Sequence, residues 1–348
     1  MLIIMDAQAT SGQIEHVNNR IKELGYQPHA IPGTTRLAIG VTGNRDADDR
    51  VHLESLPGVQ QVILVTKPYK LASRETQPED TIVTVGSVRI GGGDVVMMAG
   101  PCAVESKEQT LRIAHKVAEA GAHILRGGAF KPRTSPYAFQ GLGEKGLEIL
   151  AVAREETGLP IVTEVVSPVD AKLVAHYADM LQIGTRNMQN FELLKIVGEI
   201  GKPVLLKRGM SATLTETLMS AEYLMSHGTR DVVICERGVR TFSSHARNTL
   251  DVSFVPALKK VSHLPVVIDP SHASGNRHSV IPLGLAGIAV GADALLVDVH
   301  DDPEHALVDG PQALPPDDFK ALMQRLDRLA EALDRDLKPN RYAAEVGS

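Results

Sequence analysis

The sequence contains no tryptophan and only six tyrosines and six phenylalanines. Surfaces that stack nucleobases or sugar rings need such side chains, so their scarcity argues against that kind of binding. An excess of positive charge is also lacking. The net charge of −6 argues against nucleic acid or an anionic membrane as a bulk partner, so any basic site must be local.

Cysteine is scarce as well, and long apolar runs are absent. Two cysteines cannot form a disulfide framework, which favours a reducing compartment. The sequence has no apolar stretch of about 18 residues and no signal-peptide pattern, so we expect a cytoplasmic protein without a membrane span. Its hydrophobic content of 43% is ordinary for a globular chain with a sizeable core.

The sequence does contain one recurrent pattern, a short apolar run that ends abruptly in a polar or charged residue or a glycine. Short apolar runs separated by helix-length segments are typical of buried parallel strands. Eight such runs predict a closed (β/α)8 barrel, an α/β fold of roughly 250 residues. The runs are Val95–Ala99, His123–Leu125, Pro160–Thr163, Met180–Ile183, Pro203–Leu206, Val232–Cys235, Pro265–Ile268 and Ala294–Val297.

The first 66 residues follow a different pattern. Strand-like and helix-like segments alternate there in the order βαββαβ, which predicts a small ferredoxin-like α+β domain. We therefore expect four segments along the chain. They are a ferredoxin-like domain over 1–66, a polar linker over 67–80, the barrel over 81–337 and a frayed C-terminal tail over 338–348.

Smaller signals add detail to the barrel segment. A hairpin about Gly86-Ser87 is expected to cap the bottom of the barrel. Ser167 followed by Pro168 predicts the start of a helix, with the serine as its N-cap.

Residues that can bind a metal follow the first, seventh and eighth predicted strands, which become neighbours when a barrel closes. They are Cys102, His272, Asp298 and Asp309. One thiolate, one imidazole and two carboxylates would suit Mn, Fe, Co or Zn rather than Mg or Ca. A single cysteine after a strand most often only packs, as we expect for Cys235. Four such residues at one rim predict a metal centre.

Cationic residues gather at the same predicted strand ends. They are Arg126, Lys131, Arg133, Arg186, Lys207 and Arg237. Six cations over one cavity repel one another unless the ligand is strongly anionic, so they predict a phosphate and a carboxylate. Individual members could instead pair with Glu144, Glu164 or Glu236, or face solvent. Arg208 should point away from Lys207, because side chains alternate along a strand.

Six motifs in order resemble those of 3-deoxy-D-arabino-heptulosonate 7-phosphate (DAHP) synthases of the short-barrel, type I beta kind. That kind is itself similar to 3-deoxy-octulosonate 8-phosphate synthases. The resemblance covers about residues 82–335, and the leading unit resembles the regulatory domain of some members. The motifs are Ala99–Cys102, Arg126–Ser135, Ile183–Asn187, Leu206–Gly209, Cys235–Gly238 and Asp269–His272.

The resemblance implies condensation of phosphoenolpyruvate with D-erythrose 4-phosphate, giving DAHP and phosphate as the first step of the shikimate pathway. It also implies one divalent metal ion, Mn, Fe, Co or Zn, and no organic cofactor. The implied ligands are Cys102, His272, Asp298 and Asp309. The family usually has glutamate where this chain has Asp298, so we expect Asp298 to bind directly after a small backbone shift, or through water.

Roles for the cations follow from the same resemblance. Arg186 and Arg237 would hold the phosphate of phosphoenolpyruvate, with Gly184 and Thr185 also expected to contact substrate. The residues expected around its carboxylate are Arg126, Lys131 and Lys207.

The remaining implied roles concern the sugar and the chemistry. Lys131 would donate a proton to the new hydroxyl, and Glu164 would position the attacking water. With the metal ligands Cys102 and His272 they form the expected catalytic group. The residues expected to hold the aldose phosphate are Pro132, Arg133, Thr134 and Ser135.

Two alternatives stay open for the function. An octulosonate synthase would use arabinose 5-phosphate, although Lys131–Ser135 favours the four-carbon sugar. A non-catalytic, metabolite-binding barrel is the other alternative, and the metal ligands together with Lys131 argue against it.

The family resemblance also bears on regulation. It implies that residues 1–66 bind tyrosine or phenylalanine as a feedback inhibitor, at a subunit interface of a homotetramer or dimer. A purely structural or oligomerising module is the alternative.

Overall fold

The computed structural model describes residues 1–32, 37–43, 49–63 and 67–337, and the chain separates into two compact units. One unit comprises Met1–Glu79 with Val261–His263, and the other comprises Asp80–Lys260 with Leu264–Ser348. Part of the segment expected to be a linker is buried, including Tyr69 and Leu71. The domain boundaries given above stay predictions, and the expected tail over 338–348 lies outside the described residues.

The first unit has the ferredoxin-like arrangement that the sequence predicted. Its elements are β1 (Leu2–Met5), α1 (Ser11–Glu23), β2 (Gln27–Pro32), β3 (Leu37–Thr42), α2 (Asp49–Glu54) and β4 (Val59–Ile63). The strands form an antiparallel sheet in the order β2-β3-β1-β4. Helix α1 begins at a capping box of Thr10 and Gln13, and its apolar face buries Val17 and Ile21 against the sheet residue Ile3.

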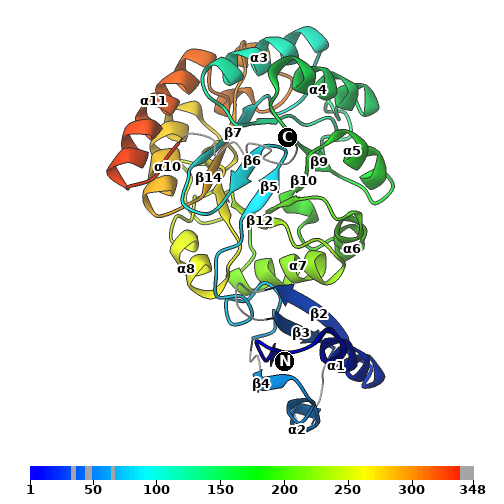
Figure 1. Ribbon diagram of the computed structural model, residues 1–348. Helices are drawn as coiled ribbons and strands as arrows, with labels where there is room; N and C mark the ends of the chain where they lie inside the picture. Colours follow the sequence, from blue (N-terminus) through cyan, green and yellow to red (C-terminus); the bar gives the residue numbers. More distant parts are fainter. Residues whose placement is uncertain (33–36, 44–48, 64–66, 338–348) are drawn as a thin grey trace, which may run out of the picture. The chain divides into compact units, whose positions relative to one another are not determined.

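The second unit is a closed barrel of parallel strands, which confirms the predicted (β/α)8 fold (Figure 1). The barrel strands are β7 (Val96–Gly100), β8 (Ile124–Arg126), β9 (Ile161–Val165), β10 (Met180–Ile183), β11 (Val204–Lys207), β12 (Val232–Glu236), β13 (Val266–Ile268) and β14 (Ala294–Asp298). Strand β14 pairs with β7, and this pairing closes the ring.

Helices surround the barrel on its outside (Figure 1). They are α3 (Lys107–Glu119), α4 (Glu144–Thr157), α5 (Ala171–Tyr177), α6 (Phe191–Ile200), α7 (Leu214–Ser226), α8 (Phe254–Val261), α10 (Arg277–Ala289) and α11 (Pro316–Ala332). The short helix α9 (Pro270–Ser274) directly follows β13. None of the helices in the described ranges is long and apolar enough to cross a membrane.

The strands extend past the apolar runs and include the first polar residue of several strand ends. Parallel pairing joins Asp298 to Gly100 and Lys207 to Cys235. The backbone hydrogen bonds of the ladder do not depend on side-chain type, so the pairing continues through a polar residue. The positions of Arg126, Lys207 and Asp298 are therefore set by the sheet.

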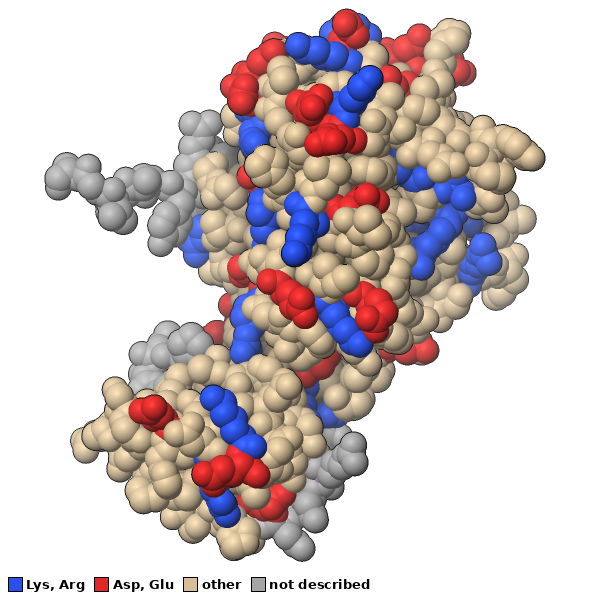
Figure 2. Space-filling view, turned by 90° about the vertical axis from the view of Figure 1, so that its right-hand side faces the viewer, with Lys and Arg blue, Asp and Glu red and all other residues tan. Residues whose placement is uncertain are grey.

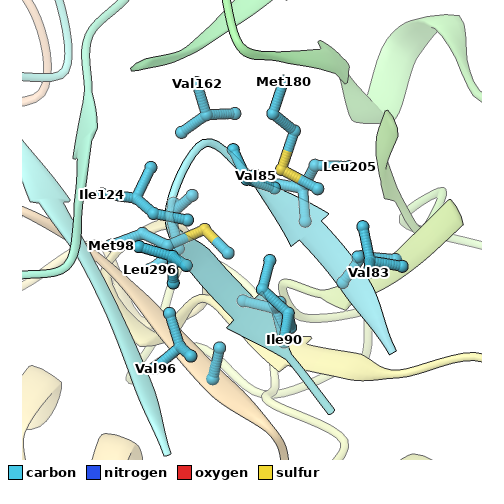
Figure 3. Close-up of a cluster of buried hydrophobic side chains, with 14 of the residues drawn as sticks. Val83, Val85, Ile90, Val96, Met98, Ile124, Val162, Met180, Leu205 and Leu296 are labelled. Carbon is cyan, nitrogen blue, oxygen red and sulfur yellow. The ribbon is translucent and has the colours of Figure 1, made fainter. Parts of the chain in front are cut away.

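The opposite end of the barrel is closed by a hairpin of β5 (Val83–Val85) and β6 (Val88–Ile90), as predicted. Figure 3 shows Val83, Val85 and Ile90 packed against barrel side chains such as Met98 and Leu296. Each fully buried side chain of this kind contributes roughly 1.5–3 kcal/mol. Apolar side chains thus fill this end of the barrel interior, and Arg126, Lys207 and Asp298 lie at the carboxyl ends of the strands.

Candidate active site

A cavity of about 300 Å³ opens among the carboxyl ends of the barrel strands and the loops that follow them. His272, Asp309 and Glu164 line it, whereas Cys102 and Asp298 are buried directly behind its wall. All eleven residues predicted to bind substrate also line it. They are Arg126, Lys131, Pro132, Arg133, Thr134, Ser135, Gly184, Thr185, Arg186, Lys207 and Arg237.

The four predicted metal ligands come together at one side of this cavity. Each offers one ligand atom, and these atoms all lie within 4.8 Å of one another. Three of them form a compact triangle. The Sγ of Cys102 is 3.2 Å from Oδ2 of Asp309 and 3.8 Å from Nε2 of His272, and Nε2 is 3.6 Å from Oδ2.

The donor chemistry of this group fits a divalent transition metal. Ligand bonds of about 2.0–2.3 Å in tetrahedral geometry place neighbouring donor atoms about 3.3–3.7 Å apart, close to the sides of the triangle. A sulfur and an imidazole nitrogen favour Mn, Fe, Co or Zn over Mg or Ca. The residues therefore fit such an ion.

The shortest contacts of Asp298 are with Arg126 and Gln312, which are not among the predicted metal ligands. Its Oδ1 pairs with Nη1 of Arg126 at 2.7 Å, and its Oδ2 accepts a hydrogen bond from Nε2 of Gln312 at 2.7 Å. The same Oδ2 lies 3.6 Å from Nδ1 of His272. Asp298 thus belongs to the buried charge network around the metal group, and its direct or water-mediated ligation stays a prediction.

Surrounding charges shift the pKa of two of the predicted metal ligands, His272 and Asp309. Burial would lower the pKa of His272, but the charges of Asp269 and Asp298 outweigh it and raise that pKa to about 9. Burial would raise the pKa of Asp309, but His272 and Arg247 bring it down to about 2. Asp309 also has a φ of 55°, a left-handed conformation that aspartate tolerates better than most residues.

Lys131 reaches from the glycine-rich loop to the metal group. Its Nζ donates to the carbonyl oxygen of Cys102 at 2.9 Å and to its Sγ at 3.2 Å. A Cβ on Gly128 would lie 2.7 Å from Cδ of Lys131, so a glycine is needed for this path. Burial opposes the charge, but Cys102 and Glu164 raise the pKa of Lys131, which remains an ammonium.

Arg237, another cation of the cavity, has a buried hydrogen-bond donor that is not used within the described part of the chain. Nη1 of Arg237 is buried and has no hydrogen-bond partner among the described residues. Burial also lowers the pKa of Arg237, because removing a charge from water is unfavourable. An anion at this guanidinium would satisfy both the donor and the charge.

The excess of positive charge is local, as the acidic net charge requires. Figure 2 shows basic side chains gathered near the right-hand edge of the barrel without acidic side chains among them. Elsewhere on that face, basic and acidic side chains are mixed.

Glu164 faces the cavity from the end of β9. A Cβ at Gly184 would lie 1.9 Å from Oε1 of Glu164, so the carboxylate packs directly on the backbone of that glycine. Gln182 donates to Oε2 of Glu164 at 3.4 Å. The carboxylate is only 6% exposed, and it is held beside the cations at the floor of the cavity.

Several residues of the site were missed by the sequence analysis. Arg247 lines the cavity and its Nη1 holds Oδ1 of Asp309 at 3.3 Å, and Gln312 supports Asp298. Asp269 lies in a recognised motif but received no role. Its carboxylate contacts both Lys207 and His272, which keep the pKa of Asp269 well below its usual value despite burial.

Two other residues lie away from the cavity, where the sequence analysis had placed them. Arg208 points away from Lys207 and pairs with Glu236 and Asp251, each at 2.9 Å. Cys235 lies in the apolar cluster inside the barrel. Glu236 therefore forms its ion pair with Arg208.

Family models and curated relatives match almost the whole chain. A model described as the DAHP synthetase I family matches residues 39–335, and one described as the DAHP synthase ferredoxin-like domain matches residues 1–67. Phospho-2-dehydro-3-deoxyheptonate aldolase of Thermotoga maritima is 48% identical over 337 residues, covering 96% of this chain and 98% of the relative. A 2-dehydro-3-deoxyphosphooctonate aldolase of Geobacter sulfurreducens is 30% identical over 263 residues, covering 70% and 96%.

Solved structures agree with these matches. The crystal structure of the Thermotoga maritima DAHP synthase superposes with a TM-score of 0.77 at 47% identity, covering 96% of this chain and 98% of that one. A truncated form of DAHP synthase from the same organism superposes with a TM-score of 0.73 at 50% identity, covering 76% and 98%.

Proposed function

Because this chain belongs to the DAHP synthetase I family, we propose that its barrel cavity binds phosphoenolpyruvate and D-erythrose 4-phosphate side by side. The chain condenses these two substrates to DAHP and phosphate, the first step of the shikimate pathway. The observation that carries the proposed binding mode is that a cavity with a cationic lining lies beside the four residues that could hold a metal.

Each substrate has a set of residues suited to its charges. We assign the phosphate of phosphoenolpyruvate to Arg186 and Arg237, because the buried donor of Arg237 needs an acceptor. Its carboxylate goes to Arg126, Lys131 and Lys207. The loop residues Pro132, Arg133, Thr134 and Ser135, with Thr185 and Gly184 nearby, are left for the sugar phosphate. Fixed cations offset the repulsion between two anionic substrates and hold them in reacting geometry.

The family is metal-dependent, and the residues that would hold the metal are Cys102, His272, Asp309 and, directly or through water, Asp298. We propose one Mn, Fe, Co or Zn ion. When bound, such an ion supplies Lewis acidity toward the aldehyde oxygen of the sugar, or orients it.

The side chains of this enzyme carry the proton and water steps in our proposal. The new carbon–carbon bond joins C3 of phosphoenolpyruvate to the aldehyde carbon, and Lys131 gives its Nζ proton to the resulting alkoxide. Water then adds at C2 and phosphate leaves by C–O cleavage. Glu164, held against Gly184 beside the cations, positions that water.

A two-sugar assay tests this function. With phosphoenolpyruvate, we expect turnover with erythrose 4-phosphate at least about tenfold above that with arabinose 5-phosphate, since the loop Lys131–Ser135 is built for the shorter sugar. Chelation should abolish the activity and added Mn or Co should restore it. Preference for arabinose 5-phosphate, or full activity in chelator, would contradict the proposal.

We also propose that residues 1–66 bind tyrosine or phenylalanine and that this lowers activity. Deletion of residues 1–70 is expected to leave kcat within about threefold, because every cavity residue lies in the second unit. The same deletion should abolish inhibition by both amino acids. Circular dichroism of the truncated protein controls for folding, and retained inhibition would place the effector site elsewhere.

We also propose a cytoplasmic location and an oligomeric assembly. Both cysteines are free, which suits the reducing cytoplasm. A homotetramer or dimer is proposed from the family resemblance.

A further inference from the structure

We propose that Asp269 couples the metal group to the anion site, so that binding of the metal and binding of phosphoenolpyruvate strengthen each other through one shared carboxylate. This inference rests on the proposed metal-dependent function. It adds a positioning residue that touches neither substrate nor metal.

The geometry of Asp269 places it between the two sites. It is fully buried at the end of β13 and caps α9, where its Oδ1 accepts a hydrogen bond from the backbone N–H of His272 at 2.9 Å. Its Oδ2 lies 2.9 Å from Nδ1 of His272 and 2.5 Å from Nζ of Lys207. A single oxygen atom is therefore shared by a metal ligand and a cavity cation.

On the metal side, Asp269 fixes the orientation of the imidazole. The Asp269 carboxylate lies on the Nδ1 side of the ring, 2.9 Å from that nitrogen, so Nε2, which faces Cys102 and Asp309, is the nitrogen left to bind a metal. A carboxylate behind a metal-binding histidine also makes that histidine a stronger donor.

On the anion side, Asp269 restrains Lys207. Lys207 is only 4% exposed, lines the cavity and is paired with Asp269 through its ammonium group. An anion in the cavity must compete with Asp269 for the same ammonium.

The shared oxygen gives the coupling its sign. A cation at Nε2 withdraws electron density from the ring, so the Nδ1 side of the imidazole attracts the Asp269 carboxylate more strongly and less of its charge is left for Lys207. Lys207 is then freer to bind an anion. Conversely, an anion bound to Lys207 weakens the hold of that lysine on Asp269, whose charge then acts more strongly on His272. By linkage, each ligand must raise the affinity for the other by the same factor.

Calorimetric titrations of the full chain test the coupling. Co²⁺ affinity is measured with and without saturating phosphoenolpyruvate, and the cobalt–thiolate absorption band checks that the ion sits at Cys102. In Asp269→Asn we expect Co²⁺ affinity to fall by about 10- to 100-fold, as for other residues behind a ligand. The factor by which phosphoenolpyruvate tightens Co²⁺ binding should fall at least about threefold.

Asp293→Asn is the matched control. Asp293 is also a buried aspartate that holds a lysine, Lys259 at 2.8 Å, and a backbone N–H, that of Val266 at 2.8 Å. It precedes β14 at the opposite end of the barrel, so this variant should keep the wild-type coupling factor. A wild-type coupling factor in Asp269→Asn overturns the proposal.

A second variant decides the question if Asp269→Asn does not fold. Lys207→Gln releases Asp269 to His272, so Co²⁺ affinity without phosphoenolpyruvate should rise at least about threefold. Arg186→Gln also removes a cavity cation, but Arg186 contacts Thr134 and not Asp269. This variant should therefore change Co²⁺ affinity less than Lys207→Gln does. Unchanged Co²⁺ affinity in Lys207→Gln overturns the coupling. Wild-type protein that binds neither ligand would instead refute the proposed function.

Discussion

Replacing Cys102 by alanine is expected to remove metal binding and to lower kcat at least about a thousandfold. The thiol contributes the softest donor of the group and one corner of the triangle with His272 and Asp309. The expected loss of metal affinity exceeds the roughly 10- to 100-fold effect of a residue behind a ligand. We attribute the expected fall in kcat to lost Lewis acidity, because a thousandfold fall corresponds to several kcal/mol of transition-state stabilisation.

Cys235→Ala provides the matched control for that experiment. Cys235 is also a buried cysteine of the barrel, but it lies within β12 among apolar side chains, and burial raises the pKa of its thiol. We expect this variant to lose about 1–2 kcal/mol of stability by thermal denaturation and to keep its metal and its kcat. Metal-dependent activity retained in Cys102→Ala at wild-type level would show that the thiolate is not a ligand.

The barrel itself was predictable from the sequence because its strands are buried on both faces. Each strand then requires a nearly continuous apolar run, such as Met180–Ile183, and that pattern can be read without knowing any contact. The start of one helix was predicted a few residues too early. Ser167 caps a turn, accepting from the N–H of Val169, and α5 begins only at Ala171.

The strand ends explain why so much of the site could also be predicted. A polar residue directly after an apolar run is held by the sheet, so Arg126, Lys207 and Asp298 had to lie at one rim. Their grouping follows from topology, and the family resemblance then supplied roles for them.

The residues that were missed act through contacts that no local pattern encodes. Arg247 belongs to an irregular loop, and its partner Asp309 lies 62 positions further along the chain. Gln312 follows the left-handed turn at Asp309 and reaches Asp298 because the irregular loop after β14 folds back on the end of that strand. The sequence around Asp269 indicates a helix cap, and the residue does cap α9. Its contact with Lys207 depends on how β11, β12 and β13 pair, which the local sequence does not encode.

Replacing Lys131 by methionine is expected to lower kcat by roughly 10²–10⁴-fold, the range of a lost proton donor, with a smaller change in KM. Methionine keeps the apolar stem that packs beside Gly128 but removes the ammonium next to Cys102. Lys131→Arg separates charge from proton transfer, because arginine keeps the charge but does not release a proton near neutral pH. Steady-state kinetics should therefore show kcat of Lys131→Arg close to that of Lys131→Met. Lys145→Met, on the exposed start of α4, should match wild type, and full rescue by arginine would make Lys131 an electrostatic group only.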